Sequence, residues 1–195
     1  GGIMKNSIFE YELSFIKNPD IKNFTIRALE SLPDYFYEVP ASSSGKYHPQ
    51  YALGKGGLVR HTKAAVRIAL ELFRCETVTG HYSDNTKDII ISALLLHDGC
   101  KHGLNNSKYT ITEHPIVVVE MIRNNNDLNN LLDKEIFDKI MNGILTHMGQ
   151  WTSDYKTGKE VLEKPKTGIQ NFIHMCDYLA SRKSIEINFE AGVSL

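Results

Sequence analysis

Five histidine and aspartate residues occupy positions where the inward face of a helix would normally carry an apolar residue. These residues are His61, His97, Asp98, His147 and Asp177. Each lies three or four residues from a leucine, isoleucine or alanine, so that it shares a helix face with them. A buried carboxylate is costly unless it is paired or bound to a metal. One histidine on an apolar face is more often a hydrogen-bonded core residue than a ligand. Five polar residues on four such faces instead favour convergence on a shared cation.

The donor atoms of this set indicate which cation would suit it. Imidazole nitrogen combined with carboxylate oxygen suits Mn, Fe, Ni, Co or Zn, and suits Mg less well. We therefore expect one or two divalent transition-metal ions per chain.

The elements that position these residues are predicted to be helices. Helical periodicity dominates the sequence, and alternating strand-like stretches are scarce. After two short helices at 4–17 and 20–31 and a loop over 40–57 rich in Pro, Ser and Gly, longer helices are predicted at 57–75, 84–98, 113–124, 133–147 and 166–184. The stretch 150–165 predicts a small hairpin or irregular insertion. The expected fold is an all-α bundle, in which 1–55 packs on a metal-binding domain over 56–185 and 186–195 forms a tail.

Length and composition limit the class of protein. The chain has 195 residues, of which 42% are hydrophobic and 23% charged, as in an ordinary soluble domain. Lys and Arg number 22 against 23 Asp and Glu, so no long-range positive field favours duplex DNA as a partner. No window reaches the roughly 18 consecutive apolar residues of a membrane-spanning helix, and we expect no membrane partner.

Cysteine usage and the N-terminal residues predict a compartment. Cys75, Cys100 and Cys176 are widely spaced and form no CxxC pair, which argues against both a disulfide framework and a zinc ribbon. The N-terminus lacks the apolar stretch of a signal peptide. These features predict a cytoplasmic protein. No heptad repeat is visible, so the sequence predicts no oligomeric state.

The order His61, His97-Asp98 and Asp177 resembles the H…HD…D signature of the HD superfamily of metal-dependent phosphohydrolases. The similar flanking text lies at 56–62, 93–98 and 177–182. The resemblance covers roughly residues 56–185 and implies an HD-type helical bundle. Around 56–61 and 147–149 the text is most similar to the exoribonuclease branch of that superfamily.

Two further histidines resemble the binuclear branch of the family, which adds two histidines between the His-Asp pair and the final aspartate. They are His114 and His147. The resemblance implies that one metal is held by His61, His97, Asp98 and Asp177. It also implies that Asp98 bridges to a second metal held by His114 and His147.

The sequence departs from the family pattern in three places. After the His-Asp pair, relatives carry an apolar residue, Gly and Lys, whereas this chain has Gly99-Cys100-Lys101. Many relatives have two consecutive histidines where this chain has His147-Met148, which predicts a weaker or differently hydrated second metal. The first 55 residues are too short and too helical for the OB-like domain of the exoribonuclease branch, which argues against processive RNA degradation.

A phosphate also needs a cation outside the metal shell. Lys101, three residues past Asp98, is the best candidate, although it could equally be a solvated surface charge. Arg182 and Arg60 are further candidates for substrate binding, but arginines in such positions are more often solvated surface charges. Trp151, the only tryptophan, could stack a nucleobase, although such an aromatic is more often core or hairpin packing.

The resemblance implies a metal-dependent phosphohydrolase that cleaves a phosphomonoester or phosphodiester with a metal-activated water. Asp98 and Lys101 are the expected catalytic residues, and a nucleotide or short oligonucleotide is the expected substrate. Two alternatives stay open. One is a di-iron HD-type oxygenase acting on a small polyol or phosphonate, and the other is a non-catalytic nucleotide-binding module.

Overall fold

The computed structural model describes residues 5–185 and 189, and the regular structure of this part of the chain is helical. The expected all-α class is therefore confirmed. The predicted helix start at residue 4 and the predicted tail over 186–195, Phe189 excepted, lie outside the described residues. The α-helices are α1 (Glu10–Leu13), α2 (Pro19–Ser31), α3 (Gly57–Phe73), α4 (Glu76–Thr79), α5 (Asp84–Leu96), α6 (His114–Arg123), α7 (Lys134–Leu145) and α8 (Gly168–Ala180). Short 3₁₀ helices cover Lys5–Phe9, Asp34–Tyr37 and Gln50–Ala52.

The five long helices predicted over 57–184 are present, but they end earlier than expected. α5 ends at Leu96 and α7 ends at Leu145, so His97, Asp98 and His147 lie just past a helix end instead of inside one. The imidazole Nδ1 of His97 and that of His147 each contact the backbone carbonyl three residues earlier, at 2.6 and 2.7 Å. A side-chain bond of this kind competes with the backbone bonds that continue a helix, and one lies directly beyond the end of both α5 and α7.

The N-terminal region is less regular than predicted. The expected helix over 4–17 is a 3₁₀ helix followed by the single turn α1, and the short helix α4 was not predicted. The buried carboxylate of Asp88 in α5 accepts hydrogen bonds from the backbone N–H groups of Lys17 and Asn18 at 2.8–3.2 Å. This bond set attaches the start of α2 to the centre of the bundle. The domain boundary at residue 55 stays a prediction.

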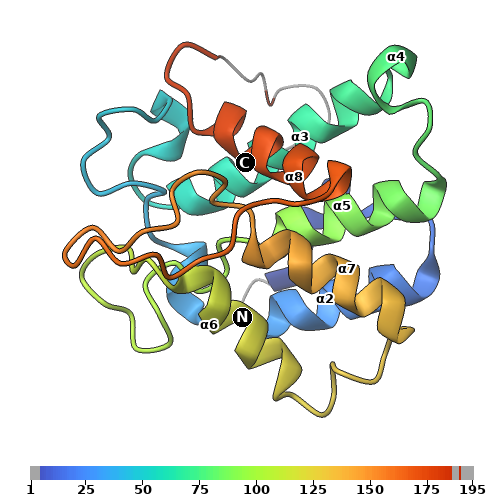
Figure 1. Ribbon diagram of the computed structural model, residues 1–195, viewed down its shortest axis with the longest axis horizontal. Helices are drawn as coiled ribbons and strands as arrows, with labels where there is room; N and C mark the ends of the chain where they lie inside the picture. Colours follow the sequence, from blue (N-terminus) through green and yellow to red (C-terminus); the bar gives the residue numbers. More distant parts are fainter. Residues whose placement is uncertain (1–4, 186–188, 190–195) are drawn as a thin grey trace.

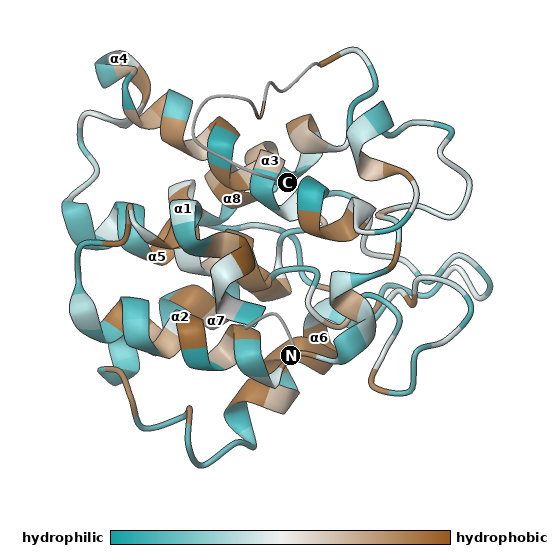
Figure 2. Cartoon of the chain, turned by 180° about the vertical axis from the view of Figure 1, so that it is seen from behind, coloured by the Kyte–Doolittle hydropathy of each residue, from teal (hydrophilic) through white to brown (hydrophobic). Residues whose placement is uncertain are grey.

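Helix α5 is the centre of the core. It packs against α2, α3, α7 and α8, and every residue from Ile89 to Leu96 is buried. A helix that is apolar on all sides is expected in such a position. Figure 2 shows the hydrophobic residues concentrated toward the interior of the bundle and the hydrophilic residues on the outer turns and loops.

The long connections lie at one end of the bundle. Figure 1 shows the loop before α3, the loop between α5 and α6, and the loop between α7 and α8 on the same side. The last of these contains the predicted hairpin, because Ser153 and Glu160 form an antiparallel bridge. The carboxylate of Asp154 accepts the N–H groups of Lys156 and Thr157 at 3.1 and 2.8 Å and closes the turn.

None of the helices in the described part of the chain has both the length and the apolar character that crossing a membrane requires.

Candidate metal centre

Six predicted ligands come from helix ends that meet at the loop-rich end of the bundle. His61 lies near the start of α3, His114 is the first residue of α6, and Asp177 lies near the end of α8. His97 and Asp98 directly follow α5, and His147 follows α7 by two residues. The end positions of five helices thus supply the whole set: His61, His97, Asp98, His114, His147 and Asp177.

The entrance to α3 explains how His61 is positioned. Gly56 has a φ of +74°, a conformation that favours glycine. A Cβ on Gly57 would collide with the backbone carbonyl of Ala52. The two glycines therefore allow the preceding loop to pack against the helix start, with His61 four residues beyond Gly57.

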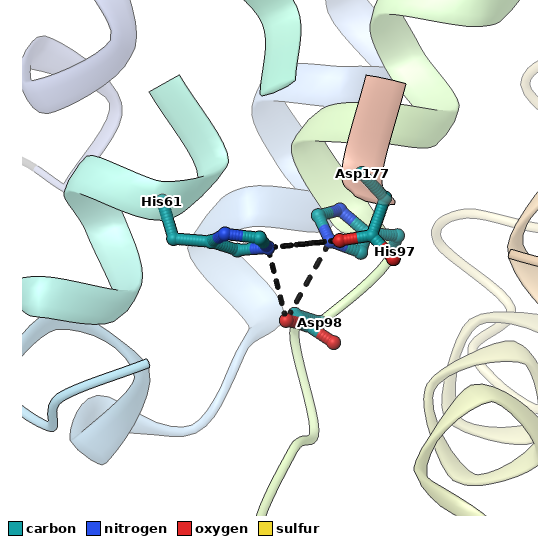
Figure 3. A group of neighbouring side chains, drawn as sticks. All are labelled: His61, His97, Asp98 and Asp177. Carbon is teal, nitrogen blue, oxygen red and sulfur yellow. Dashed lines mark hydrogen bonds and ion pairs between the residues drawn. The ribbon is translucent and has the colours of Figure 1, made fainter. Parts of the chain in front are cut away.

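Four of the six residues form what we call the open group: His61, His97, Asp98 and Asp177. The Nε2 atoms of His61 and His97 lie 3.0 and 3.3 Å from Asp177 Oδ1. The same two nitrogens lie 3.6 and 3.5 Å from Asp98 Oδ2. Figure 3 shows the four side chains pointing toward one another.

The sealed group, as we call it, consists of Asp98, His114 and His147. Here the second oxygen of the shared carboxylate is used: Asp98 Oδ1 lies 3.1 Å from His114 Nε2 and 3.5 Å from His147 Nε2. The two imidazole nitrogens lie 3.2 Å apart. Asp98 therefore belongs to both groups, through a different oxygen in each.

Hydrogen bonds on the far side of the rings indicate the protonation state. Nδ1 of His97, His114 and His147 each lies 2.6–2.7 Å from a backbone carbonyl. A carbonyl only accepts, so each Nδ1 carries a proton, and each Nε2 presents a lone pair when its ring is neutral. Metal-binding histidines almost always hold their second nitrogen in this way.

In the sealed group this arrangement places hydrogen-bond acceptors next to one another: Nε2 of His114, Nε2 of His147 and Oδ1 of Asp98. Oδ1 of Asp98 is buried and has no hydrogen-bond partner among the described residues, because a neutral ring with its proton on Nδ1 has no proton on Nε2 to give it. Metal–nitrogen and metal–oxygen bonds of about 2.0–2.2 Å imply distances between neighbouring ligand atoms of about 2.8–3.6 Å, from octahedral to tetrahedral angles. The observed separations of 3.0–3.6 Å lie within that range. The residues thus fit a metal ion in each group.

The electrostatics of the cluster agree with a site that attracts cations. Burial alone would raise the pKa of Asp98, but Lys101 and His97 hold that pKa well below its usual range. The pKa of Asp177 is also held well below its usual range, against the effect of burial, by His97 and His61. Burial alone would lower the pKa of His97, yet the two carboxylates raise it to about 9. Without a metal, a proton on His97 neutralises the site; a metal would displace that proton.

A pocket of about 440 Å³ opens onto the open group and not onto the sealed one. Its lining includes His61, Asp177 and Lys101, but neither His114 nor His147. Nζ of Lys101 lies 2.6 Å from Asp98 Oδ2 and its side chain is 13% exposed, so this ammonium connects the bridging carboxylate with the pocket. A larger cavity of about 920 Å³ between α3 and α5 has a mostly apolar lining and none of the six residues.

The three cations predicted to bind substrate differ in position. Lys101 and Arg182 line the pocket. Arg60 does not: its guanidinium donates to the carbonyls of Tyr51, Leu53 and Lys55 at 2.6–2.9 Å. These bonds hold the loop before α3 in place and leave Arg60 away from the predicted substrate contact.

His48 is a pocket residue that the sequence did not reveal. It lies in the Pro, Ser and Gly-rich loop, and its ring centroid is 6.1 Å from that of His61. Burial, with the neighbouring His61 and Lys101, lowers the pKa of His48 to about 4. His48 is therefore neutral at physiological pH. A loop has no helical periodicity, so the sequence carried no sign that His48 lies at the pocket.

Two other histidines occupy supporting positions. Nδ1 of His174 lies 2.7 Å from the carbonyl oxygen of His147, so His174 fixes the backbone that carries a sealed-group residue. His102 lies away from the pocket, stacked on Tyr35 at 5.4 Å. Trp151, for which core packing was the more common expectation, is 46% exposed and lines the pocket.

Comparison with protein-family models, with curated proteins and with solved structures finds no match to this chain. The geometry of the buried cluster is compatible with an HD-type metal site.

Proposed function

We propose that the chain is an HD-type metal-dependent phosphohydrolase that cleaves a phosphomonoester or phosphodiester, with a nucleotide or short oligonucleotide as substrate. The observation that carries the proposal is the sharing of Asp98 between two acceptor-rich groups, one of which faces a pocket with a lysine in its wall. Metal ions held by these groups would supply Lewis-acid stabilisation of phosphate charge and lower the pKa of a water molecule.

The chain's own residues bind and orient the phosphate in this proposal. The ammonium of Lys101 reaches the pocket while it contacts Asp98, so it can neutralise an anionic substrate beside the metal groups. Arg182, which also lines the pocket, supplies a second cation. Neutral His48 offers a ring nitrogen that can donate or accept a hydrogen bond at the substrate.

The test compares the wild-type protein with Asp98→Asn for metal content and for phosphate release from a panel of nucleoside phosphates, cyclic nucleotides and dinucleotides. Asn replaces one carboxylate oxygen with an amide NH2, which does not ligate a metal, and removes the negative charge that both groups share. This change should remove metal and lower turnover on the order of 10³-fold or more. The matched control is Asp88→Asn, because Asp88 is equally buried on α5 but contacts only the backbone near α2.

The control should keep its metal and its turnover per folded molecule. Undiminished hydrolysis by Asp98→Asn would contradict the proposal. The donor set also suits iron, so oxygen uptake by the iron-loaded protein without phosphate release would instead identify the di-iron oxygenase. Tight nucleotide binding without either reaction would identify the binding module.

A further inference from the structure

Three side chains form a layered stack in one wall of the pocket. The ring of Trp151 lies nearly parallel to that of Tyr178, with centroids 5.7 Å apart and an interplanar angle of 14°. The guanidinium carbon of Arg182 lies 4.6 Å from the centroid of the same tyrosine ring. All three residues line the pocket. Trp151 is 46% exposed, so this large aromatic surface is available at the pocket.

The position of Trp151 is fixed by the backbone that also carries His147. Gly149 has a φ of +63°, and a Cβ there would collide with the ring of His174. That ring contacts Trp151 edge-on, with centroids 6.0 Å apart, and its Nδ1 bonds the carbonyl of His147. The indole is therefore held in place by packing on two sides before any ligand arrives.

The same pocket has two chemically different parts. One part presents His61, Asp177 and the ammonium of Lys101, and the other presents the indole of Trp151. A volume of about 440 Å³ is within the range of pockets that enclose small organic ligands, about 300–1,000 Å³. A ligand that satisfies both parts has an anionic phosphate joined to a planar aromatic ring, as a nucleotide does.

We propose that Trp151, supported by Tyr178 and Arg182, is a base-binding subsite that stacks the nucleobase of a mononucleotide whose phosphate lies beside Lys101. This inference rests on the proposed function, because it deepens the substrate class of the same pocket. Stacking on an aromatic side chain is tolerant of base identity, since every base has a π-face. The subsite therefore selects nucleotides over phosphates that lack a base.

The unique tryptophan makes the subsite directly observable. Indole fluorescence of the metal-loaded protein is titrated with AMP, GMP, CMP and UMP, and separately with ribose 5-phosphate. We expect saturable quenching by at least one nucleotide and none by ribose 5-phosphate. Equal responses to ribose 5-phosphate and to all four nucleotides, or no response to any of them, would overturn the inference.

Substitution supplies a second readout. Trp151→Ala should weaken binding of the quenching nucleotide about 5- to 150-fold, the factor expected for one stacked base, and should leave ribose 5-phosphate binding unchanged by calorimetry. Trp151→Phe should retain most of the affinity. The matched control is Tyr155→Ala, since Tyr155 is a 73% exposed aromatic of the same connection outside the pocket.

The two proposals fail in different ways. Quenching without hydrolysis of any nucleotide would remove the phosphohydrolase and keep the subsite. In the opposite result, Trp151→Ala and Tyr155→Ala both hydrolyse nucleotides as fast as the wild type, while no nucleotide quenches the indole fluorescence. That result would remove the subsite and keep the phosphohydrolase.

Discussion

The open and sealed groups share Asp98 but differ in access to the pocket. In the open group, Asp177 is 16% exposed, and it lines the pocket together with His61. In the sealed group, His114 and His147 are almost fully buried and do not reach the pocket. The same donor types therefore form a face toward the pocket and a face toward the core.

The two groups also differ in how firmly their rings are held. Both sealed-group histidines bond a carbonyl through Nδ1, and so does His97 of the open group. The buried Nδ1 of His61 in the open group has no hydrogen-bond partner among the described residues. The sealed rings thus have a fixed orientation and tautomer. The comparison indicates that both rings of the sealed group have a fixed setting, whereas in the open group the ring of His61 lacks this constraint.

The largest expected effect comes from removing one ligand from each group in turn. Asp177→Asn should lower kcat/KM on the order of 10³-fold, because the group facing the substrate loses a charged ligand. His147→Gln should have a smaller effect, about 10- to 100-fold, because the open group stays intact. Steady-state kinetics of both variants on one nucleotide measures the difference, with Asp88→Asn as the control. If His147→Gln lowered kcat/KM as much as Asp177→Asn or more, the proposal that the open group and not the sealed group faces substrate would be contradicted.

An intermediate effect is expected at Lys101. Hydrogen bonds to charged groups contribute about 1.5–3 kcal/mol, so Lys101→Met should raise KM for phosphate substrates about 10- to 150-fold. Metal affinity should not fall, because the ammonium competes with a cation for Asp98 Oδ2. Lys108→Met, at an exposed lysine in the following loop, should change neither quantity. A loss of metal in Lys101→Met would show that the lysine orders the open group instead of contacting substrate.

The remaining effect is on stability and not on turnover, and it concerns pH and the metal-free protein. The pKa of His97 is about 9 in the folded chain against an ordinary value of 6.5, so the protonated ring stabilises the fold. That contribution is complete below about pH 6.5 and is lost as pH rises through 9. Urea unfolding with a chelator should show a free energy of unfolding that falls by a few kcal/mol over this window.

In the metal-loaded protein the free energy of unfolding should not fall in this way between pH 6.5 and 9, because the metal takes the place of the proton on His97. Metal affinity should rise as pH increases, since bound protons compete with the cation. If the free energy of unfolding depends on pH in the same way with and without metal, then no ion binds where His97 is protonated.

Much of the site could be predicted from the sequence because helical periodicity exposes polar residues on buried faces. His61, Asp98 and Asp177 interrupt apolar stripes, and the family resemblance added His114. The structure brings these residues together. The all-α class followed from the same periodicity.

The loop residues could not be predicted in this way. His48 and the 3₁₀ helix Gln50–Ala52 lie in a segment without periodicity, so their places depend on tertiary contacts. Arg60 precedes a candidate ligand in sequence, but its side chain points to the carbonyls of that loop. Adjacent residues of a helix face different directions, and the neighbour of a ligand is therefore a weak candidate for substrate binding.

The central claim is that two metal groups share Asp98, and metal content tests it most directly. Protein purified without chelator or nickel resin is loaded with Mn or Fe, dialysed, and measured by elemental mass spectrometry. The account predicts about two ions per chain in the wild type, about one in His147→Gln, and close to none in Asp98→Asn. A wild-type chain that retains no ion would contradict it, as would an Asp98→Asn variant that retains two.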